Sequence, residues 1–283
     1  MPLDVLSYYE KNTPRFLRFG GSTRATGVMH RAVKTPASSG AGRGRDGVNE
    51  VLLQVLRDSG VFETPEPSLL DLGCGVGGTI HWIRRATGVT PAGITLSPVQ
   101  AQIASRRLAG VVTGSFTARD DLAKALAGSR INGAWMIESF VHTNDVDALF
   151  AAVAAHIAAG GVLVIIDDFP RHNFGSPEVP ASRLDRRLVA EFRRGWHIHT
   201  LLSPSEASAV AARHGWTLER SLDLTSSVRT NRPRDVLARA FAPAARLFGA
   251  RSAWWQNVLG GSALQRLHRR RRVAYQVLVF RRR

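Results

Sequence analysis

The sequence predicts an α/β fold with a doubly wound, mostly parallel β-sheet. Three observations predict it: apolar runs of strand length alternate with helical patterns between residues 69 and 168, the connections are short, and a glycine-rich turn follows the first run. The length of 283 residues suits one large domain with insertions or two small domains.

The glycine-rich turn is Gly73-Cys74-Gly75-Val76-Gly77-Gly78, directly after a predicted strand at residues 69–72. Glycine has no Cβ, so such a turn takes positive φ angles and lets a ligand approach the backbone closely. A helix expected at residues 79–87 would offer unpaired N–H groups at its start. In open parallel sheets ligands bind at this edge, so the turn is the predicted centre of the site.

The remaining elements follow from periodicity and capping signals. Ser97 is expected to cap a helix that has Pro98 at its first position. A helix at 48–59 precedes the first strand. Further strands are expected at 90–96, 111–116, 131–138 and 161–168, and further helices at 98–108, 121–126 and 145–159.

We expect residues 1–47 to form an N-terminal lid segment and residues 48–283 to form the main domain. Two insertions, at 171–200 and about 230–267, should lie on the substrate side, the first with a basic helix at 181–194. A helix from Pro204 to His214 then leads to two late strands, 217–224 and 273–280, which we expect to form a terminal hairpin.

The formal net charge of +16 comes almost entirely from arginine, with a dense cluster in residues 266–283. Such clusters suit nucleic acid, anionic lipid or phosphorylated substrates, but no nucleic-acid-binding module accompanies this one. Cys74 is the only cysteine, so no intrachain disulfide can form, and a cytoplasmic setting is expected. No run of about 18 apolar residues predicts a membrane span.

The ligand of the turn is indicated by the residues around it. The glycines also match the dinucleotide pattern, but the second strand ends in Thr95-Leu96-Ser97 and lacks the acid that would hold a ribose. Asp71 stands two residues before the first glycine, where a carboxylate would repel a pyrophosphate. It suits a cationic ligand with an amino group, such as S-adenosylmethionine.

At these residues the chain resembles the class I S-adenosylmethionine-dependent methyltransferases. The stretch from Asp71 to Gly77 looks like their first motif, and residues 93–100 resemble the second-strand motif of one branch. That branch contains cyclopropane fatty acid synthases and sterol and tocopherol C-methyltransferases. Residues 135–142, with Glu138 and His142, are similar to its fourth-strand motif, and residues 8–19 to its aromatic lid. The resemblance implies a seven-stranded Rossmann-like sheet.

The resemblance and the strand positions together give the candidate site. The candidate catalytic residues are Glu138, His142 and Tyr9. Cys74 is expected to be a small turn residue and not a nucleophile, while Gln100, Phe116 and His142 also fit ordinary surface, core or capping roles. The candidate cofactor-binding residues are Asp71, Gly73, Cys74, Gly75, Gly77, Thr95, Leu96, Ser97, Gln100, Ser115, Phe116 and Glu138.

Two further groups of polar residues have ordinary interpretations. Asp167-Asp168 and the pair His197 and His199 carry metal-ligating side chains without a further ligand at suitable spacing, so no metal is expected. The arginines of the first insertion suit a solvated helix face, with a diphosphate clamp as the alternative; they are Arg183, Arg186, Arg187, Arg193 and Arg194.

The predicted activity is transfer of the S-adenosylmethionine methyl group to carbon of a hydrophobic small molecule, such as an isoprenoid. The alternatives are O- or N-methylation of a small metabolite, an RNA methyltransferase that uses the basic C-terminal residues, and a non-catalytic cofactor-binding module. Nucleic acid is not the expected partner. A membrane surface and a homodimer stay open.

Overall fold

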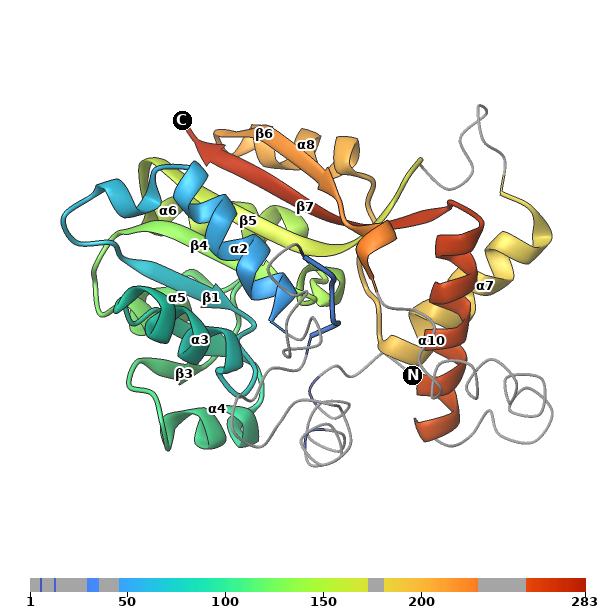
Figure 1. Ribbon diagram of the computed structural model, residues 1–283, viewed down its shortest axis with the longest axis horizontal. Coiled ribbons are helices and arrows are strands. Elements are labelled where there is room, and N and C mark those ends of the chain that lie inside the picture. Colours follow the sequence, from blue (N-terminus) through green and yellow to red (C-terminus); the bar gives the residue numbers. More distant parts are fainter. Residues whose placement is uncertain (1–5, 7–12, 14–29, 36–45, 173–180, 229–252) are drawn as a thin grey trace.

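The structure is a computed structural model that describes residues 6, 13, 30–35, 46–172, 181–228 and 253–283. A seven-stranded sheet has the order β3-β2-β1-β4-β5-β7-β6 (Figure 1). Only β7 runs antiparallel to its neighbours β5 and β6. The strands are β1 (Leu69–Leu72), β2 (Ala92–Thr95), β3 (Val111–Thr113), β4 (Ile131–Ile137), β5 (Ile157–Pro170), β6 (Trp216–Asp223) and β7 (Val273–Arg282).

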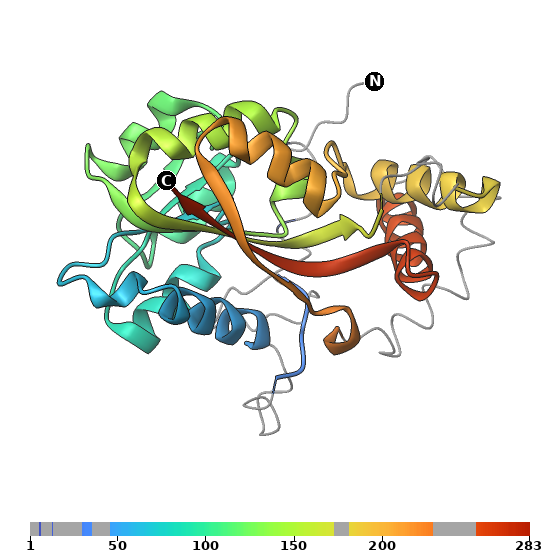
Figure 2. The ribbon, with the colours of Figure 1, turned by 90° about the horizontal axis from the view of Figure 1, so that it is seen from above.

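Helices cover both faces of the sheet, and the view from above shows three layers (Figure 2). On one face lie α2 (Gly47–Asp58) and α3 (Gly78–Thr87), and on the other α5 (Arg119–Leu126), α6 (Val146–His156) and α8 (Pro204–Arg213). The helix α4 (Pro98–Ser105) follows β2 near the sheet edge formed by β3. The part of the chain described here contains no helix of sufficient length and apolar character to cross a membrane.

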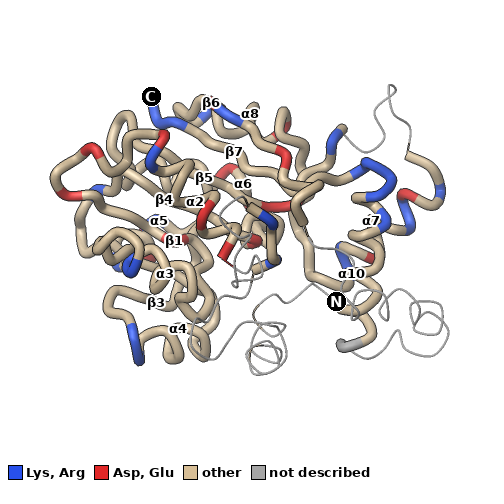
Figure 3. Tube along the Cα trace, in the orientation of Figure 1, with Lys and Arg blue, Asp and Glu red and all other residues tan. Residues whose placement is uncertain are grey.

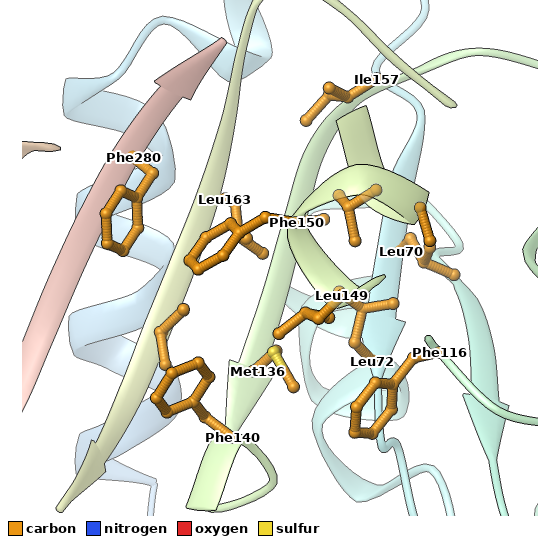
Figure 4. Packing of buried hydrophobic residues seen from close by; sticks show 14 of the residues in the cluster. Leu70, Leu72, Phe116, Met136, Phe140, Leu149, Phe150, Ile157, Leu163 and Phe280 are labelled. Carbon is orange, nitrogen blue, oxygen red and sulfur yellow. The ribbon is translucent and has the colours of Figure 1, made fainter. Parts of the chain in front are cut away.

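Alternating side chains of the strands divide the core between the two faces. Leu70 and Leu72 pack with Phe150 and Phe280 toward α5, α6 and α8 (Figure 4). Leu69 and Trp135 pack on the other face, with Leu52 of α2 and Ile83 of α3. Because Asp71 alternates with Leu70 and Leu72, its carboxylate lies on the α2 and α3 face, at the end of β1.

The predicted order of strands and helices is confirmed, including the antiparallel pairing of β6 and β7. Several boundaries were wrong: the helix expected at 145–159 ends at His156, and β5 starts at Ile157 and not at residue 161. Ile157 is buried and pairs with Ile131, so burial against the sheet outweighs the alanine-rich helical pattern there. The helix at 98–108 ends at Ser105 and the third strand at Thr113, both earlier than expected.

Two helices extend beyond the carboxyl end of β5: α7 (Arg183–Trp196) and α10 (Ala253–Arg269) (Figure 1). The predicted basic helix is thus confirmed, and Ser182 caps it with a capping box to Asp185. Asp185 is fully buried and binds Arg270 at 2.7 Å and Arg272 at 3.1 Å. This double ion pair joins the start of α7 to the turn between α10 and β7. The expected helical stretch before residue 253 lies outside the described residues.

Candidate active site

The glycine turn forms the first wall of the site. The backbone N–H groups of Gly73 and Cys74 both donate to the carbonyl of Ile94, at 2.9 and 3.0 Å. Gly73 has a φ of 87°, and a Cβ there would lie 2.6 Å from the Cβ of Ser139. Only glycine fits this position, because a side chain would be strained and would collide with the loop after β4. The turn is therefore held tightly between β2 and β4.

Asp71 is 3% exposed, and burial raises the pKa of its carboxyl group to about 7. A buried carboxyl group in this state gains most from a cationic partner, because an ammonium group restores the stability of its charged form. The α-amino group and the sulfonium of S-adenosylmethionine supply such charge. A buried carboxyl group at Asp71, next to a turn that exposes backbone groups and no large side chains, therefore fits this cofactor.

The end of β2 is organised around Gln100. Thr95 donates its hydroxyl hydrogen to the side-chain carbonyl of Gln100 at 2.9 Å, and the Gln100 amide donates to the Thr13 hydroxyl at 3.0 Å. The Ser97 hydroxyl accepts from the Gln100 backbone N–H at 3.3 Å and caps α4, as the sequence predicts. Leu96 is 42% exposed. Thr13 thus places one residue of the expected N-terminal lid against this motif.

The residues after β3 complete the predicted cofactor side. The Ser115 hydroxyl lies 2.7 Å from that of Thr117, and the Ser115 N–H donates to Asp121. Phe116 is buried, with its ring 3.7 Å from the position of a Cβ on Gly73. The turn, the end of β2 and Phe116 therefore lie close together, although the cofactor contacts of these residues stay predictions.

Cys74 directs its thiol away from this edge. The side chain is buried with Ile80 and Leu108, and a Cβ on Gly93 would lie 2.9 Å from its Sγ. Burial raises the pKa of the thiol well above its usual range, so the thiolate is disfavoured. This environment suits the expected role of a small turn residue.

Glu138 directly follows β4 and has a φ of 52°, a left-handed conformation that is uncommon outside glycine. Its Oε1 accepts three hydrogen bonds: from the Arg31 backbone N–H at 2.9 Å, from Arg31 Nε at 3.0 Å and from the Tyr275 hydroxyl at 3.1 Å. The second oxygen, Oε2, has no hydrogen bond to any described residue, and the side chain is 23% exposed. The carboxylate is thus fixed by one oxygen only.

Asp168 lies at the end of β5, beside Glu138. Its two oxygens accept from Arg31 Nη1 at 3.1 Å and Nη2 at 2.6 Å, and Oδ1 also lies 2.9 Å from His268 Nε2. Burial favours the neutral acid, but Arg31 and His268 hold the pKa of Asp168 below its usual value. Arg31 therefore bridges two carboxylates, Glu138 and Asp168.

The neighbouring Asp167 has a different task. It accepts hydrogen bonds from the backbone N–H groups of Val141 and Asp168, at 3.1 and 2.8 Å. Burial, together with the adjacent Asp168, raises the pKa of Asp167 to about 8, so it is mostly protonated at neutral pH. One carboxyl group of the predicted pair is charged and the other supports the backbone of the loop after β4.

His142 lies on that loop, where its Nδ1 is 3.1 Å from the carbonyl of His197. A carbonyl can only accept, so Nδ1 carries the hydrogen and Nε2 carries the lone pair. Burial lowers the pKa of His142 to about 4, which leaves the ring neutral at physiological pH. His197 ends α7 in a left-handed conformation, so His197 and His199 do not lie along one extended strand. The described residues hold no metal-ligating group of three or more side chains.

A family model described as a methyltransferase domain matches residues 31–221. The chain belongs to this methyltransferase family. An O-methyltransferase of Pyrenophora dematioidea is 27% identical over 173 residues, or 59% of this methyltransferase and 60% of that protein. A 2-methyl-6-phytyl-1,4-hydroquinone methyltransferase of Synechocystis is 29% identical over 132 residues, covering 47% and 41%. The matches thus span about half the length of these curated relatives.

Among solved structures, geranyl diphosphate C-methyltransferase from Streptomyces coelicolor is similar to 98% of this methyltransferase and 98% of its own chain, with a TM-score of 0.64. It was crystallised with Mg²⁺, geranyl diphosphate and S-adenosyl-L-homocysteine. At 17% identity the similarity concerns the fold. The family assignment makes this chain a member of a methyltransferase family, and the turn and Asp71 fit S-adenosylmethionine as the cofactor.

Several site residues were missed by the sequence patterns. Arg31, His268 and Tyr275 come from segments at least 100 residues from one of their partners, and no local motif marks them. The signal available was the unexplained pair of acids at the ends of two adjacent strands, which requires a counterion. Tyr9, with the rest of the aromatic lid, lies outside the described residues.

Proposed function

We propose that this methyltransferase methylates a carbon atom of a hydrophobic, isoprenoid-type small molecule. The observation that carries the proposal is the state of Glu138, whose Oε1 is bound by three donors while Oε2 stays available on a partly exposed side chain. β4 lies next to β1, so this oxygen belongs to the same sheet edge as the glycine turn.

S-adenosylmethionine supplies an electrophilic methyl group. When the π electrons of an alkene form the new C–C bond, the C–S electron pair leaves with sulfur and the acceptor becomes a carbocation. An anionic oxygen such as Glu138 Oε2 stabilises this positive charge electrostatically. Loss of a proton from the neighbouring carbon restores the double bond, and Glu138 or the Nε2 lone pair of His142 is suited to accept it.

The surroundings of Glu138 favour an apolar acceptor. Tyr275 and Trp196 present aromatic rings at this edge, 4.2 and 5.9 Å from the Arg31 guanidinium carbon. Aromatic faces also stabilise positive charge. Two similar proteins are named after acceptors that carry a phytyl or a geranyl chain, which supports the same substrate class.

The arginines of α7 do not enter this proposal. All five are exposed, and Figure 3 shows basic residues along α7. Arg187 pairs with Glu191 on the same helix, while Arg186 and Arg193 donate to the carbonyls of Ala181 and His199. This is the arrangement of a solvated helix face.

O-methylation is the second candidate. A neutral His142 with a lone pair on Nε2 can take a proton from a hydroxyl, and one of the similar proteins is an O-methyltransferase. The acceptor then needs an acidic hydroxyl group and no alkene.

An acceptor panel separates these candidates. The enzyme with ¹³C-methyl S-adenosylmethionine is offered geranyl diphosphate, a prenylated hydroquinone, a simple phenol and a secondary amine, and the label is located by NMR. The proposal expects a new C–CH₃ signal from a prenyl-bearing acceptor, which Glu138→Gln should reduce at least about 100-fold. The control Glu219→Gln changes a surface pair with Arg281 and should leave the rate unchanged. A label found only on oxygen or nitrogen would contradict carbon methylation.

A further inference from the structure

Arg31 is placed where it controls both acids of the acceptor side. Its backbone N–H and Nε bind Glu138 Oε1, while Nη1 and Nη2 form a fork to Asp168. The guanidinium carbon lies 4.2 Å from the centre of the Tyr275 ring, and the side chain is 18% exposed. The planar guanidinium group thus binds the Glu138 carboxylate through Nε and the Asp168 carboxylate through Nη1 and Nη2.

We infer that Arg31 is a positioning residue that fixes the orientation of the Glu138 carboxylate, so that one oxygen faces the acceptor. Arg31 and Tyr275 together bind Oε1, so the carboxylate cannot turn away from the acceptor without breaking three hydrogen bonds. Oε2 is then the oxygen presented to the reacting carbon. The inference rests on the proposed function of Glu138 and adds a residue to it.

The side chain of Arg31 is not what attaches its own segment to the protein. Val33 forms an antiparallel bridge with Val228, and the Lys34 N–H donates to the carbonyl of Ser227 at 2.9 Å. A Cβ on Gly47 would lie 2.2 Å from the Val33 carbonyl oxygen, so the start of α2 also packs closely on this segment. The backbone of residues 33–34 is therefore secured independently, and a change at Arg31 should act mainly on the two acids.

Glu138 requires such positioning because of its backbone. A non-glycine residue with a φ of 52° is strained, and such strain persists only when the surrounding contacts hold the residue. The Glu138 N–H donates to the Ile166 carbonyl at 2.9 Å, which fixes the backbone. The side chain depends on Arg31 and Tyr275.

The charges around Arg31 give the inference a measurable consequence. Asp168 faces Arg31 and His268, and it adjoins Asp167 in sequence. Glu138 faces Arg31 and Tyr275, and His142 lies nearby on the loop after β4. Arg31 holds the pKa of Asp168 down against burial. Without the guanidinium, burial dominates, so Asp168 should take up a proton at a higher pH than in the wild type.

The test compares Arg31→Met and Arg31→Lys with the wild type. Arg171→Met is the matched control, because it removes an arginine that pairs with Asp223 at the surface. Carboxyl ¹³C NMR of aspartate-labelled protein follows Asp168, assigned with Asp168→Asn. Turnover is measured with an acceptor that the panel identifies. Binding of S-adenosylhomocysteine by calorimetry verifies that each variant is folded.

We expect the Asp168 titration of Arg31→Met to move upward by at least one pH unit, and the acid limb of kcat to move with it. The kcat value should fall about 30-fold, with S-adenosylhomocysteine affinity within about twofold of the wild type. Arg31→Lys keeps the charge but not the fork, so its titration should move little while its kcat stays at least about fivefold below the wild type.

An unchanged Asp168 titration together with wild-type kcat in Arg31→Met would overturn the inference. If Arg31→Met does not fold, wild-type kcat in Arg31→Lys would overturn it in the same way. Failure of the proposed function has a different signature: Glu138→Gln itself would then turn over at the wild-type rate. If Glu138→Gln is inactive while Arg31→Met is fully active, the positioning role of Arg31 is refuted and the proposed function of Glu138 is retained.

Discussion

The two sides of the binding edge are built in different ways. On the cofactor side, the turn from Gly73 to Gly78 and the cluster from Thr95 to Gln100 are continuous in sequence. On the acceptor side, the contacts of Arg31 and His268 join distant segments: Arg31 lies 107 residues from Glu138 and 137 from Asp168, and His268 lies 100 from Asp168. The first side is shaped by backbone conformation and the second by charge.

This difference has a physical consequence. Backbone amides and glycines shape the cofactor side, and among its described residues Asp71 is the one buried ionisable group besides the Cys74 thiol. The acceptor side places Glu138, Asp168 and Arg31 together in a largely buried space, where each charge depends on the others. Substitutions on the first side should therefore change cofactor affinity, and substitutions on the second should change rate and pH dependence.

The largest effect is expected at Asp71. Replacement by Asn keeps the shape but removes the charge that pairs with the cofactor ammonium group, so affinity for S-adenosylmethionine should fall about 100-fold by calorimetry. Asp223→Asn serves as the control, because Asp223 is the last residue of the edge strand β6, which is separated from β1 by three strands. Unchanged affinity in Asp71→Asn would remove this residue from the cofactor site.

The next effect concerns pH and His142. Its folded-state pKa of about 4 lies below the ordinary 6.5, so the unfolded chain binds a proton first as the pH falls. Between pH 7 and pH 5 the wild type should therefore lose about 2 kcal/mol of unfolding free energy relative to His142→Gln. Asp71 and Asp167, with raised pKa values, act in the opposite direction and cancel in this comparison. The unfolding free energies are measured with urea at both pH values. If the wild type and His142→Gln lose the same unfolding free energy between pH 7 and pH 5, the buried, neutral state of His142 is contradicted.

A smaller effect is expected for Tyr275→Phe. Loss of one of the three donors to Glu138 Oε1 should lower kcat at least about tenfold, since one hydrogen bond to a charged group contributes about 1.5 to 3 kcal/mol. The Kd for S-adenosylhomocysteine should not change. A fall in cofactor affinity equal to the fall in kcat would show that the two sides are not separable at Tyr275.

The smallest effect is expected for Thr13→Val. This isosteric change removes the acceptor of the Gln100 amide and so loosens the contact between the N-terminal segment and the end of β2. S-adenosylmethionine affinity should weaken about threefold, measured by calorimetry against Thr217→Val on the edge strand β6 as a control. If Thr13→Val instead lowers kcat alone, the contact belongs to the acceptor side.

The contrast between the two sides also explains what the sequence could predict. The turn, the cap at Ser97 and the strand order depend on local patterns, and the structure agrees with them. Glu138 was placed at the end of β4 by the same means. The partners of Glu138 were not predictable from local patterns. Arg31 reaches Glu138 only through tertiary packing, and Tyr275 reaches it because β7 runs antiparallel to β5. The role of Asp167 depends on burial, which a single sequence does not show.

The most direct test of this division measures two quantities on Glu138→Gln: the Kd for S-adenosylmethionine and the single-turnover rate of methyl transfer to the acceptor found in the panel. The account predicts a Kd within about twofold of the wild type and a rate at least about 100-fold lower. A wild-type rate, or a loss of cofactor affinity large enough to explain the lost turnover, would contradict the assignment of Glu138 to the acceptor side.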